Sequence, residues 1–385
     1  MMDYSFRSVR QILCESGGLA RVGGLMQGLG ASRVLIVCDP GIVTLGFSET
    51  AVASLSQAGI AVEVYARVAA DPPVSMVQEA VAAARAFRAD GVIGIGGGSS
   101  LDTAKLVALM INSTQPIEEM YGTNLASGTR VPLIQVPTTA GTGSEVTWVS
   151  VVTDNEGRKK AIYAPQLLPD VALLDPMLTL GLPPRITAAT GLDAMVHAIE
   201  AYTSRTAKNL VSDALAVKAL QLLGSNIRTA VADGSNVEAR AAMLQGSLLA
   251  GMAFVNASVA AIHALAYPLG ARYHVPHGHS NAIVMAPIMR FNLPVAAPAY
   301  AELARQMMPD RSFSSDAIAA EALVHEVEEL VPAMGLELKM RELGVPQEAI
   351  ASMAEEVDTG IRRLIACNPR DMSRADIEAI YQSVY

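Results

Sequence analysis

The stretch GVIGIGGGSSLDTAKLVALMIN (residues 91–112) joins a short strand pattern, a glycine turn and a helical pattern. Gly96, Gly97 and Gly98 have no Cβ, so the backbone can turn sharply there and approach a ligand closely. The helix expected from about Ser100 directs its free N–H groups and its dipole at the turn, which favours an anion. The stretch therefore predicts a pyrophosphate site, although a tight turn without a ligand has the same pattern.

The turn departs from the usual nucleotide fingerprints, because Ser99 stands where G-x-G-x-x-G requires its third glycine. A second polar loop, PTTAGTGSE (137–145), follows the next strand pattern. In open α/β sheets, ligands bind at the carboxyl ends of the strands. Two such loops after successive strands favour a nucleotide site more than either loop does alone.

Asp39 ends the strand pattern of RVLIVCD (33–39). A carboxylate at a strand end can accept hydrogen bonds from both ribose hydroxyls of an adenosine and would repel a 2′-phosphate. In the ordinary dinucleotide fold this acid follows the glycine loop by about twenty residues, whereas Asp39 precedes it. The alternative, an aspartate that starts the turn at Pro40–Gly41, has about equal support.

The first half of the chain alternates strand and helix patterns, which is typical of βαβ units and a mainly parallel sheet. Helical patterns cover residues 73–87 and 100–112, and residues 147–163 predict a hairpin with its turn at Asp154–Gly157. The predicted strands are 33–39, 61–68, 91–98, 131–139 and 171–175.

The pattern changes at Pro183–Pro184, a strong breaker, after which no convincing strand occurs. We therefore expect a Rossmann-like α/β dinucleotide-binding domain over residues 1–183 and an all-α domain over residues 184–385. The predicted helices of the second domain are 187–203, 209–231, 237–254, 296–307 and 315–334.

Composition excludes several classes of partner. The net charge is −9 and no run of Lys or Arg occurs, which disfavours nucleic acid and acidic membrane surfaces. No charged residue lies between Arg240 and Arg272, and this segment is long enough to span a bilayer. Because it contains Asn256, His263 and Pro268, we expect a helix buried on all sides of a large soluble domain.

The start of the chain and the cysteines predict a cytoplasmic protein. The first residues, MMDYSFRSVRQIL, contain no apolar h-region, so we expect no signal peptide. The three cysteines are far apart, odd in number and without C-x-x-C spacing, which suits reduced thiols.

A carboxylate and an imidazole project together from GLDAMVHAIEAY, where Asp193 and His197 are separated by one helical turn. Such a pair is half of a divalent metal site, although taken alone it is more often a hydrogen bond on a helix surface. Four of the six histidines lie in HALAYPLGARYHVPHGH (263–279) and can complete the site. His263 is also expected as a buried core residue, and spacing does not choose among His274, His277 and His279.

The chain resembles the iron-containing (group III) alcohol dehydrogenases, a family that includes lactaldehyde reductase and 1,3-propanediol dehydrogenase. The resemblance covers nearly the whole chain and rests on four stretches in the same order and spacing: GGGSSLDTAK, PTTAGTGSE, GLDAMVHAIEAY and HALAYPLGARYHVPHGHSNA.

The resemblance implies reversible hydride transfer between a small alcohol, with its aldehyde or ketone, and NAD rather than NADP. It implies a homodimer and an active site in the cleft between the two domains. The implied metal is Fe²⁺, or Zn²⁺ in some members, and the implied ligands are Asp193, His197, His263 and His277. The implied cofactor-binding residues are Asp39, Gly96, Gly97, Gly98, Ser99, Asp102, Thr138, Thr139, Thr142 and Lys160.

One departure from the family concerns the proton relay. Many members have a second histidine four residues after the position of His263, and this chain has Tyr267 there. A tyrosine has an unperturbed pKa of about 10 and needs perturbation or a water chain to act near neutrality. Tyr267 and His279 are therefore the candidates for proton transfer, while His274 and His279 are otherwise expected near the surface.

Three other functions remain open from the residues. A maleylacetate-reductase-like enzyme shares the fold and needs no metal, so the complete ligand set argues against it. A metal-dependent lyase related to the dehydroquinate synthases would give product without net NADH change. A non-catalytic nucleotide-binding protein would bind cofactor without turnover.

Overall fold

The computed structural model describes residues 3–385, and these divide into two compact units. The α/β unit comprises Ser8–Gly181, and the helical unit comprises Leu182–Tyr385 joined by residues 3–7. The sequence predicts a domain boundary at residue 183. The short segment before Ser8 was expected in the first domain but packs with the second: the Arg7 amide donates to Asn256 Oδ1 (2.8 Å).

The α/β unit is built on a six-stranded sheet in which every strand pair is parallel. Its order is β1-β9-β6-β4-β2-β3, and the five strands after β1 correspond to the five predicted ones. The bounds are β1 Gln11–Cys14, β2 Arg33–Val37, β3 Ala61–Tyr65, β4 Gly91–Gly96, β6 Leu133–Pro137 and β9 Val171–Leu174. The central strands β4 and β6 are buried throughout, as expected for a parallel sheet covered on both faces.

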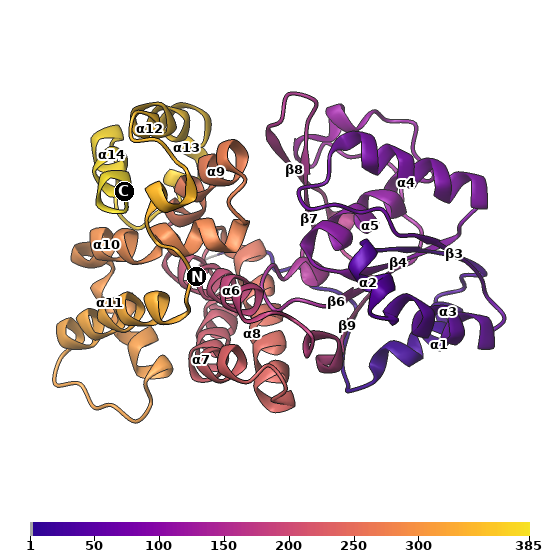
Figure 1. The fold of residues 1–385 in the computed structure, drawn as a ribbon, viewed down its shortest axis with the longest axis horizontal. Helices are drawn as coiled ribbons and strands as arrows, with labels where there is room; N and C mark the ends of the chain where they lie inside the picture. Colours follow the sequence, from indigo (N-terminus) through magenta and orange to yellow (C-terminus); the bar gives the residue numbers. More distant parts are fainter. Residues whose placement is uncertain (1–2) are drawn as a thin grey trace. The chain divides into compact units, whose positions relative to one another are not determined.

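Helices cover both faces of this sheet (Figure 1). On one face, α1 (Val22–Gly28) and α3 (Phe47–Gln57) pack on a core that includes Ile36 and Ile93. On the other face, α4 (Val74–Phe87) and α5 (Gly98–Met110) enclose a second core that includes Leu35 and Val92. Successive residues of one strand thus enter opposite cores, which is the period of two that a strand imposes. The remaining helical pieces are η1 Gly18–Arg21, α2 Pro40–Thr44, η2 Ile117–Met120, η3 Ser144–Val146, η4 Pro165–Leu167 and η5 Pro176–Thr179.

The predicted hairpin is present as β7 (Val149–Thr153) and β8 (Lys159–Tyr163), which pair antiparallel. Asp154 closes the turn, because its amide donates to the Arg158 carbonyl and its Oδ1 accepts from two backbone amides. The short β5 (Gly122–Thr123) adds to β8 and completes a separate three-stranded sheet.

The helical unit contains no strand among its described residues, as predicted. Its bounds are α6 Pro184–Thr203, α7 Leu210–Ala232, α8 Val237–Ala257, α9 Ala261–Tyr273, α10 His277–Met307, α11 Asp316–Ala333, η6 Met340–Leu343, α12 Ala349–Gly360, α13 Arg362–Ile365 and α14 Arg374–Ser383. The prediction found only the last third of α10, because three internal prolines interrupt its pattern. It also missed α12, α13 and α14.

The charge-free segment from Arg240 to Arg272 was expected as one helix and is two. Helices α8 and α9 meet at a bend of 105°. Ser258 lies in the break with φ 108°, a backbone conformation that non-glycine residues rarely adopt. The prediction was wrong here, because no glycine or proline marks the break.

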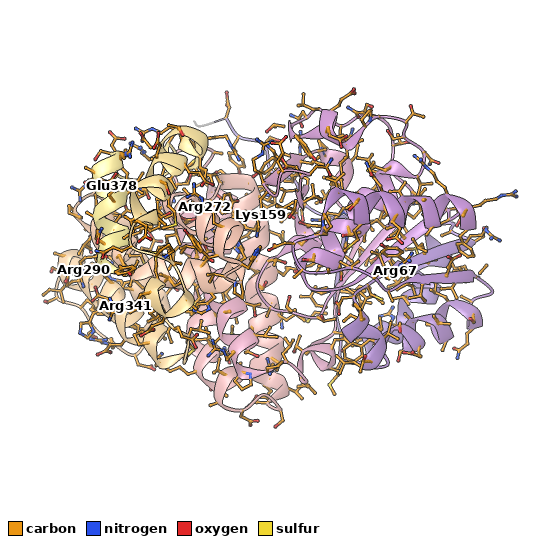
Figure 2. All side chains as sticks on the ribbon, turned by 45° about the horizontal axis from the view of Figure 1, so that its top comes forward. Arg67, Lys159, Arg272, Arg290, Arg341 and Glu378 are labelled. Atoms are coloured by element: carbon orange, nitrogen blue, oxygen red, sulfur yellow. The ribbon has the colours of Figure 1, made fainter. Side chains whose placement is uncertain are left out.

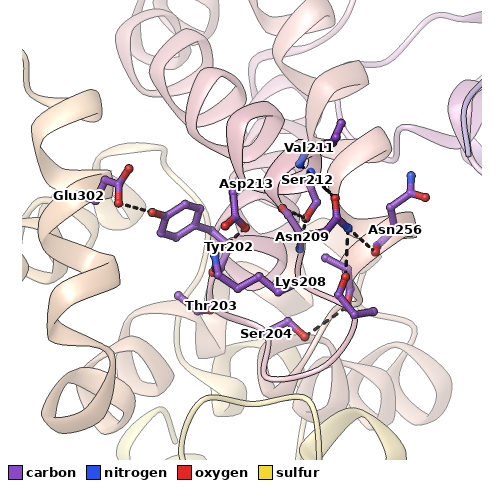
Figure 3. Close-up of polar contacts among 12 residues, drawn as sticks. Tyr202, Thr203, Ser204, Lys208, Asn209, Val211, Ser212, Asp213, Asn256 and Glu302 are labelled. Atoms are coloured by element: carbon purple, nitrogen blue, oxygen red, sulfur yellow. Dashed lines mark hydrogen bonds and ion pairs between the residues drawn. The ribbon is translucent and has the colours of Figure 1, made fainter. Parts of the chain in front are cut away.

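Polar contacts fix the start of α7 and the end of α6 (Figure 3). Asn209 and Ser212 form a reciprocal capping box at the start of α7. The Tyr202 hydroxyl near the end of α6 donates to the Glu302 carboxylate on α10. At the periphery of the same unit, Arg290, labelled in Figure 2, pairs with acidic side chains of α11.

By length and composition alone, α10 could cross a membrane, and α8 with α9 meet the same test only as a bent pair. One or two such helices are weak grounds for a span, because core helices of soluble proteins satisfy the criterion. Asn281 and Asn292 of α10 are buried and donate to Asp193 and Asn368. These are contacts of a helix packed within the helical unit.

Candidate functional site

The order of the sheet identifies where a nucleotide would bind in the α/β unit. After β2 the chain runs to β3 on one side, and β4 then pairs on the other side of β2. The carboxyl ends of β2 and β4 therefore flank a topological switch point, the usual ligand position in an open α/β sheet. Asp39 follows β2 and the glycine turn follows β4, so the structure brings these two predicted features together.

The glycine turn is packed so closely that side chains would not fit. Gly96 has φ +142°, and a Cβ there would lie 2.7 Å from Ser100 Oγ. A Cβ on Gly98 would lie 2.8 Å from the Thr142 methyl group. Gly98 begins α5, whose first N–H groups have no helical partner and can bind an anion.

The second polar loop lies directly beside this turn. Strand β6 pairs with β4, and the Thr138 amide donates to the Gly96 carbonyl (3.0 Å). Thr139 contacts the position of a Gly97 Cβ at 3.6 Å. Thr138, Thr139 and Thr142 therefore surround the turn, as the pairing of successive strands predicted.

The contacts of Asp39 are compatible with both predicted roles, as the cap of a turn and as a carboxylate facing the nucleotide site. Its Oδ1 accepts from the Gly41 amide (2.9 Å) and caps α2, as a turn-initiating aspartate does. Its Oδ2 accepts from Ser100 Oγ (3.4 Å) and would lie 3.1 Å from a Cβ on Gly96. The carboxylate thus lies at the glycine turn.

Asp102 is held by protein groups. Its Oδ1 accepts from Ser144 Oγ (2.6 Å) and lies 3.3 Å from Lys105 Nζ, and its Oδ2 accepts from the Val151 amide (2.8 Å). Lys105 is fully buried and also donates to Thr147 and to the Val149 carbonyl. Burial lowers the pKa of Lys105, and the nearby Asp102 opposes that shift. This network joins α5 to the second polar loop and to β7.

Two further polar side chains in this region have different surroundings. Burial raises the pKa of Glu145, at the end of the second polar loop, to about 7, and its Oε1 has no hydrogen-bond partner. Lys160 lies on β8 and is partly exposed, with Nζ 3.9 Å from Asp154 Oδ2. The sequence prediction had not singled out Glu145, Lys105 or Ser144.

The helical unit brings the predicted metal ligands together, three of them buried and His277 about one-third exposed. Asp193 and His197 project from the middle of α6 and are 2% and 5% exposed. His263 lies in the first turn of α9, and His277 is the first residue of α10. The ligand atoms of Asp193, His263 and His277 all lie within 4.8 Å of one another.

The distances between these atoms are close to those expected around a single ion. Atoms bound about 2.0–2.2 Å from one tetrahedral metal lie roughly 3.3–3.6 Å apart. Asp193 Oδ1 is 3.6 Å from His277 Nε2 and 3.9 Å from His263 Nε2. His263 Nε2 is 3.1 Å from His197 Nε2. One carboxylate oxygen and two imidazole nitrogens thus lie close together, and the His197 ring adds a third nitrogen beside His263.

Asn281 lies beside these atoms. Its amide Nδ2 donates to Asp193 Oδ1 (2.6 Å) and is 3.3 Å and 3.4 Å from the Nε2 atoms of His263 and His277. Its Oδ1 is buried without a hydrogen-bond partner. A partial positive charge therefore faces the converging lone pairs, which is the electrostatic role that a cation fills. Asn281 was not predicted, although it lies one helical turn after His277.

Electrostatics keep Asp193 anionic. Burial alone raises the pKa of a carboxyl group, but the facing His197, His277 and His263 outweigh it and lower the pKa of Asp193. Burial disfavours the charged form of His263, and Glu200 outweighs this effect and raises the pKa of His263. Glu200 was also missed, although it lies seven residues after Asp193 on the same face of α6.

Tyr267, His274 and His279 have different surroundings. Tyr267 lies on α9 with its ring centroid 6.1 Å from that of His277, so it is beside the ligand set. His274 is exposed, as expected. The expectation that His279 lies near the surface was wrong: it is 4% exposed, and its Nε2 contacts the Glu337 carbonyl at 2.5 Å. The first turn of α10 packs against α6, and this orientation places His279 on the buried side of the helix.

Comparison with known proteins gives one consistent result. Residues 10–176 match the family described as iron-containing alcohol dehydrogenase, and residues 187–385 match the C-terminal part of the Fe-containing alcohol dehydrogenase family. The chain is 40% identical over 372 residues to long-chain-alcohol dehydrogenase 1 of Geobacillus thermodenitrificans (strain NG80-2), covering 96% of this chain and 93% of that protein.

Solved structures agree. A 1,3-propanediol oxidoreductase structure is similar with a TM-score of 0.95 and 34% identity, over 100% of both chains. A sulfoacetaldehyde reductase from Bifidobacterium kashiwanohense, in complex with NAD⁺, is similar with a TM-score of 0.90 and 27% identity, over 100% of this chain and 99% of that one. These proteins are named as alcohol or aldehyde oxidoreductases, so the maleylacetate-reductase-like alternative is not favoured. The chain belongs to the iron-containing alcohol dehydrogenase family.

Proposed function

We propose that this protein interconverts a small alcohol and its aldehyde or ketone, using NAD and one divalent metal, Fe²⁺ in preference to Zn²⁺. One observation carries the proposal: in the helical unit, a carboxylate oxygen and two imidazole nitrogens lie within 4.8 Å of one another, and a third imidazole nitrogen lies 3.1 Å from one of them, which is close enough for one ion. The proposed ligands are Asp193, His197, His263 and His277.

The chemistry of the ligand set suits this reaction. When bound, the metal supplies Lewis-acid polarisation of an alcohol or carbonyl oxygen, and the nicotinamide accepts or donates the hydride. Only Asp193 among the four ligands is anionic, so the set does not neutralise a divalent charge. Phe254 stacks on the His197 ring at 4.3 Å between centroids and gives that side of the set an apolar wall. An apolar wall limits water at the reacting atoms.

The α/β unit supports the choice of NAD. The glycine turn and the first N–H groups of α5 suit a pyrophosphate, and Thr138, Thr139 and Thr142 surround it. Asp39 can accept from the ribose hydroxyls and would repel a 2′-phosphate. Asp102 would act on the cofactor mainly by holding the second polar loop, because its oxygens already accept hydrogen bonds from Ser144 and Val151.

For the proton, we favour Tyr267 over His279. Tyr267 lies beside His277, whereas the Nε2 of His279 is engaged by the Glu337 backbone carbonyl. A hydroxyl at that place can pass a proton from the substrate oxygen to water or to the cofactor ribose. The common cleft, the homodimer and the cytoplasmic location stay predictions.

The test begins with metal analysis of protein purified anaerobically without chelator. We expect about one iron per chain. Activity is measured with NAD⁺ and with NADP⁺ over short alcohols, diols and their aldehydes. It should be lost on chelation and recover when Fe²⁺ is added. His263→Ala should lose the metal, and the matched control His274→Ala, at an exposed histidine nearby, should keep it. Full activity in protein shown to be free of metal would disprove the mechanism.

A further inference from the structure

We propose that Glu200 is the positioning residue of the metal site: it fixes the tautomer and direction of His263 and holds the start of α9 in place. This inference deepens the proposed function and rests on it. No ligand role is assigned to Glu200, because its carboxylate faces the far side of the His263 ring from the converging lone pairs.

Glu200 lies on the same face of α6 as two of the proposed metal ligands. Asp193, His197 and Glu200 occupy positions i, i+4 and i+7, which lie on a single helical face. All three are buried, and Glu200 is 3% exposed. A buried carboxylate is costly unless hydrogen bonds satisfy it, so its partners have to explain its presence.

The partners of Glu200 are three N–H groups of one short segment. Its Oε2 accepts from the Ala260 amide (2.8 Å) and contacts His263 Nδ1 (2.7 Å), and its Oε1 accepts from the Ile262 amide (2.6 Å). No side chain of α9 caps this helix start. Glu200 therefore caps α9 from a neighbouring helix and satisfies donors that every helix start leaves free.

The position of this cap matters because the chain is strained just before it. Helices α8 and α9 bend by 105° at a break that contains Ser258 with φ 108°. A backbone conformation of this kind persists only where the surroundings hold it. Glu200 supplies two such hydrogen bonds, and they fix the first turn of α9, which carries His263.

The same carboxylate selects the tautomer of His263. A carboxylate can only accept hydrogen bonds, so the proton of a neutral His263 lies on Nδ1. Nε2 is then the lone-pair atom, and it is the atom that lies 3.9 Å from Asp193 Oδ1 and 3.1 Å from His197 Nε2. Carboxylate partners of this kind orient metal-bound histidines and affect metal affinity by about 10–100-fold.

Glu200→Gln tests the assignment with nearly unchanged volume. Its amide has one acceptor oxygen and an NH₂ group, so it cannot accept from all three N–H groups. We expect the Zn²⁺ dissociation constant, measured by chelator competition on protein with a native circular dichroism spectrum, to rise about 10–100-fold. The visible spectrum of the Co²⁺-loaded variant should also change, since it reports ligand geometry.

Tyr202→Phe is the matched control. It removes the hydrogen bond from α6 to Glu302 shown in Figure 3 and does not touch the ligand set. We expect lower stability in this variant with a Zn²⁺ dissociation constant within about twofold of the unmodified protein, because its hydrogen bond lies outside the groups that orient the metal ligands. If Glu200→Gln also binds Zn²⁺ as tightly as this control and keeps the Co²⁺ spectrum, Glu200 is only a helix cap and the proposal is wrong.

A second measurement needs no variant. In Zn²⁺-loaded protein labelled with ¹⁵N-histidine, His263 should show metal-bound Nε2 and protonated Nδ1. Metal-bound Nδ1 would overturn the proposal even if Glu200→Gln failed to fold. The outcomes also separate the two proposals: no metal binding by the unmodified protein contradicts the proposed function, whereas tight binding by Glu200→Gln contradicts only the role of Glu200.

Discussion

Gly278→Ala should loosen the metal site through a single methyl group. Gly278 follows the proposed ligand His277 at the start of α10, and a Cβ there would lie 2.2 Å from the Ala189 carbonyl oxygen on α6. Real Cβ contacts are essentially never below 3.0 Å, so α10 has to retreat from α6 by about 1 Å. The atom in the way is backbone and cannot turn aside as a flexible side chain would.

The magnitude follows from two opposing effects. Alanine is better than glycine inside a helix by at most about 1 kcal/mol, while overpacking of this kind costs about 1–3 kcal/mol. We therefore expect a net loss of about 1–2 kcal/mol in the free energy of unfolding, measured by urea denaturation. The larger effect should be on the metal, because metal–ligand distances tolerate only about ±0.2 Å and His277 would move about five times as far.

The assay is chelator competition for Zn²⁺ on Gly278→Ala, with Gly24→Ala as control. Gly24 lies inside α1, and a Cβ there would meet open space, so its replacement should not reduce stability. We expect Zn²⁺ affinity to fall at least about tenfold in the first variant, because misplaced supporting groups typically cost about 10–100-fold. Native affinity together with native stability in Gly278→Ala would refute the backbone-contact argument.

Three further outcomes follow from charges and hydroxyl groups. Asp39→Asn should keep the α2 cap and raise kcat/KM for NADP⁺ by about tenfold or more, since a repelling charge is removed; an unchanged NAD⁺/NADP⁺ ratio would contradict the ribose assignment. Asp170→Asn should cost about 3 kcal/mol at pH 7, because it breaks a buried pair with Arg130. Burial alone would raise the pKa of Asp170, but the hydrogen bond and charge of Arg130 outweigh burial and lower it. The ion pair therefore contributes its full stabilisation above the unfolded pKa of Asp170 and loses it as the pH falls through the folded pKa. In urea titrations, the difference in unfolding free energy between the two proteins should therefore begin to narrow as the pH falls below about 4, the unfolded pKa, and a constant difference would contradict the pair. Tyr267→Phe should shift the pH profile of turnover, and an identical profile would exclude Tyr267 from the relay.

The core of the α/β unit was predictable because local pattern and burial agree there. Strands β2, β4 and β6 are short, mostly apolar runs, and all of their residues except Arg33 are buried. The edge strand β1 was missed, since its sequence QILC is short and mostly exposed. Its place is determined by β9, which lies far away along the chain.

In the helical unit, the sequence identified the candidate metal ligands more readily than the positions of the helices that carry them. The pattern of Asp193 and His197 indicated one face of a helix, and the family resemblance selected His263 and His277. The bend before α9 was not predictable, because a carboxylate on α6 stabilises it from outside the segment. His279 was misplaced for a similar reason: the facing of the first turn of α10 depends on its contact with α6.

The pairing of β1 with β9 has a consequence for the order in which the molecule can form. Gln11 pairs with Val171, and the Arg7 amide donates to Asn256, so these residues near the start of the chain have partners that are synthesised much later. At a synthesis rate of about 5–20 residues per second, β1 leaves the ribosome roughly 10–30 s before β9. During that interval its backbone donors and acceptors have no strand to pair with. β1 has only four residues and lies at the edge of the sheet, so few backbone groups stay unpaired during that interval.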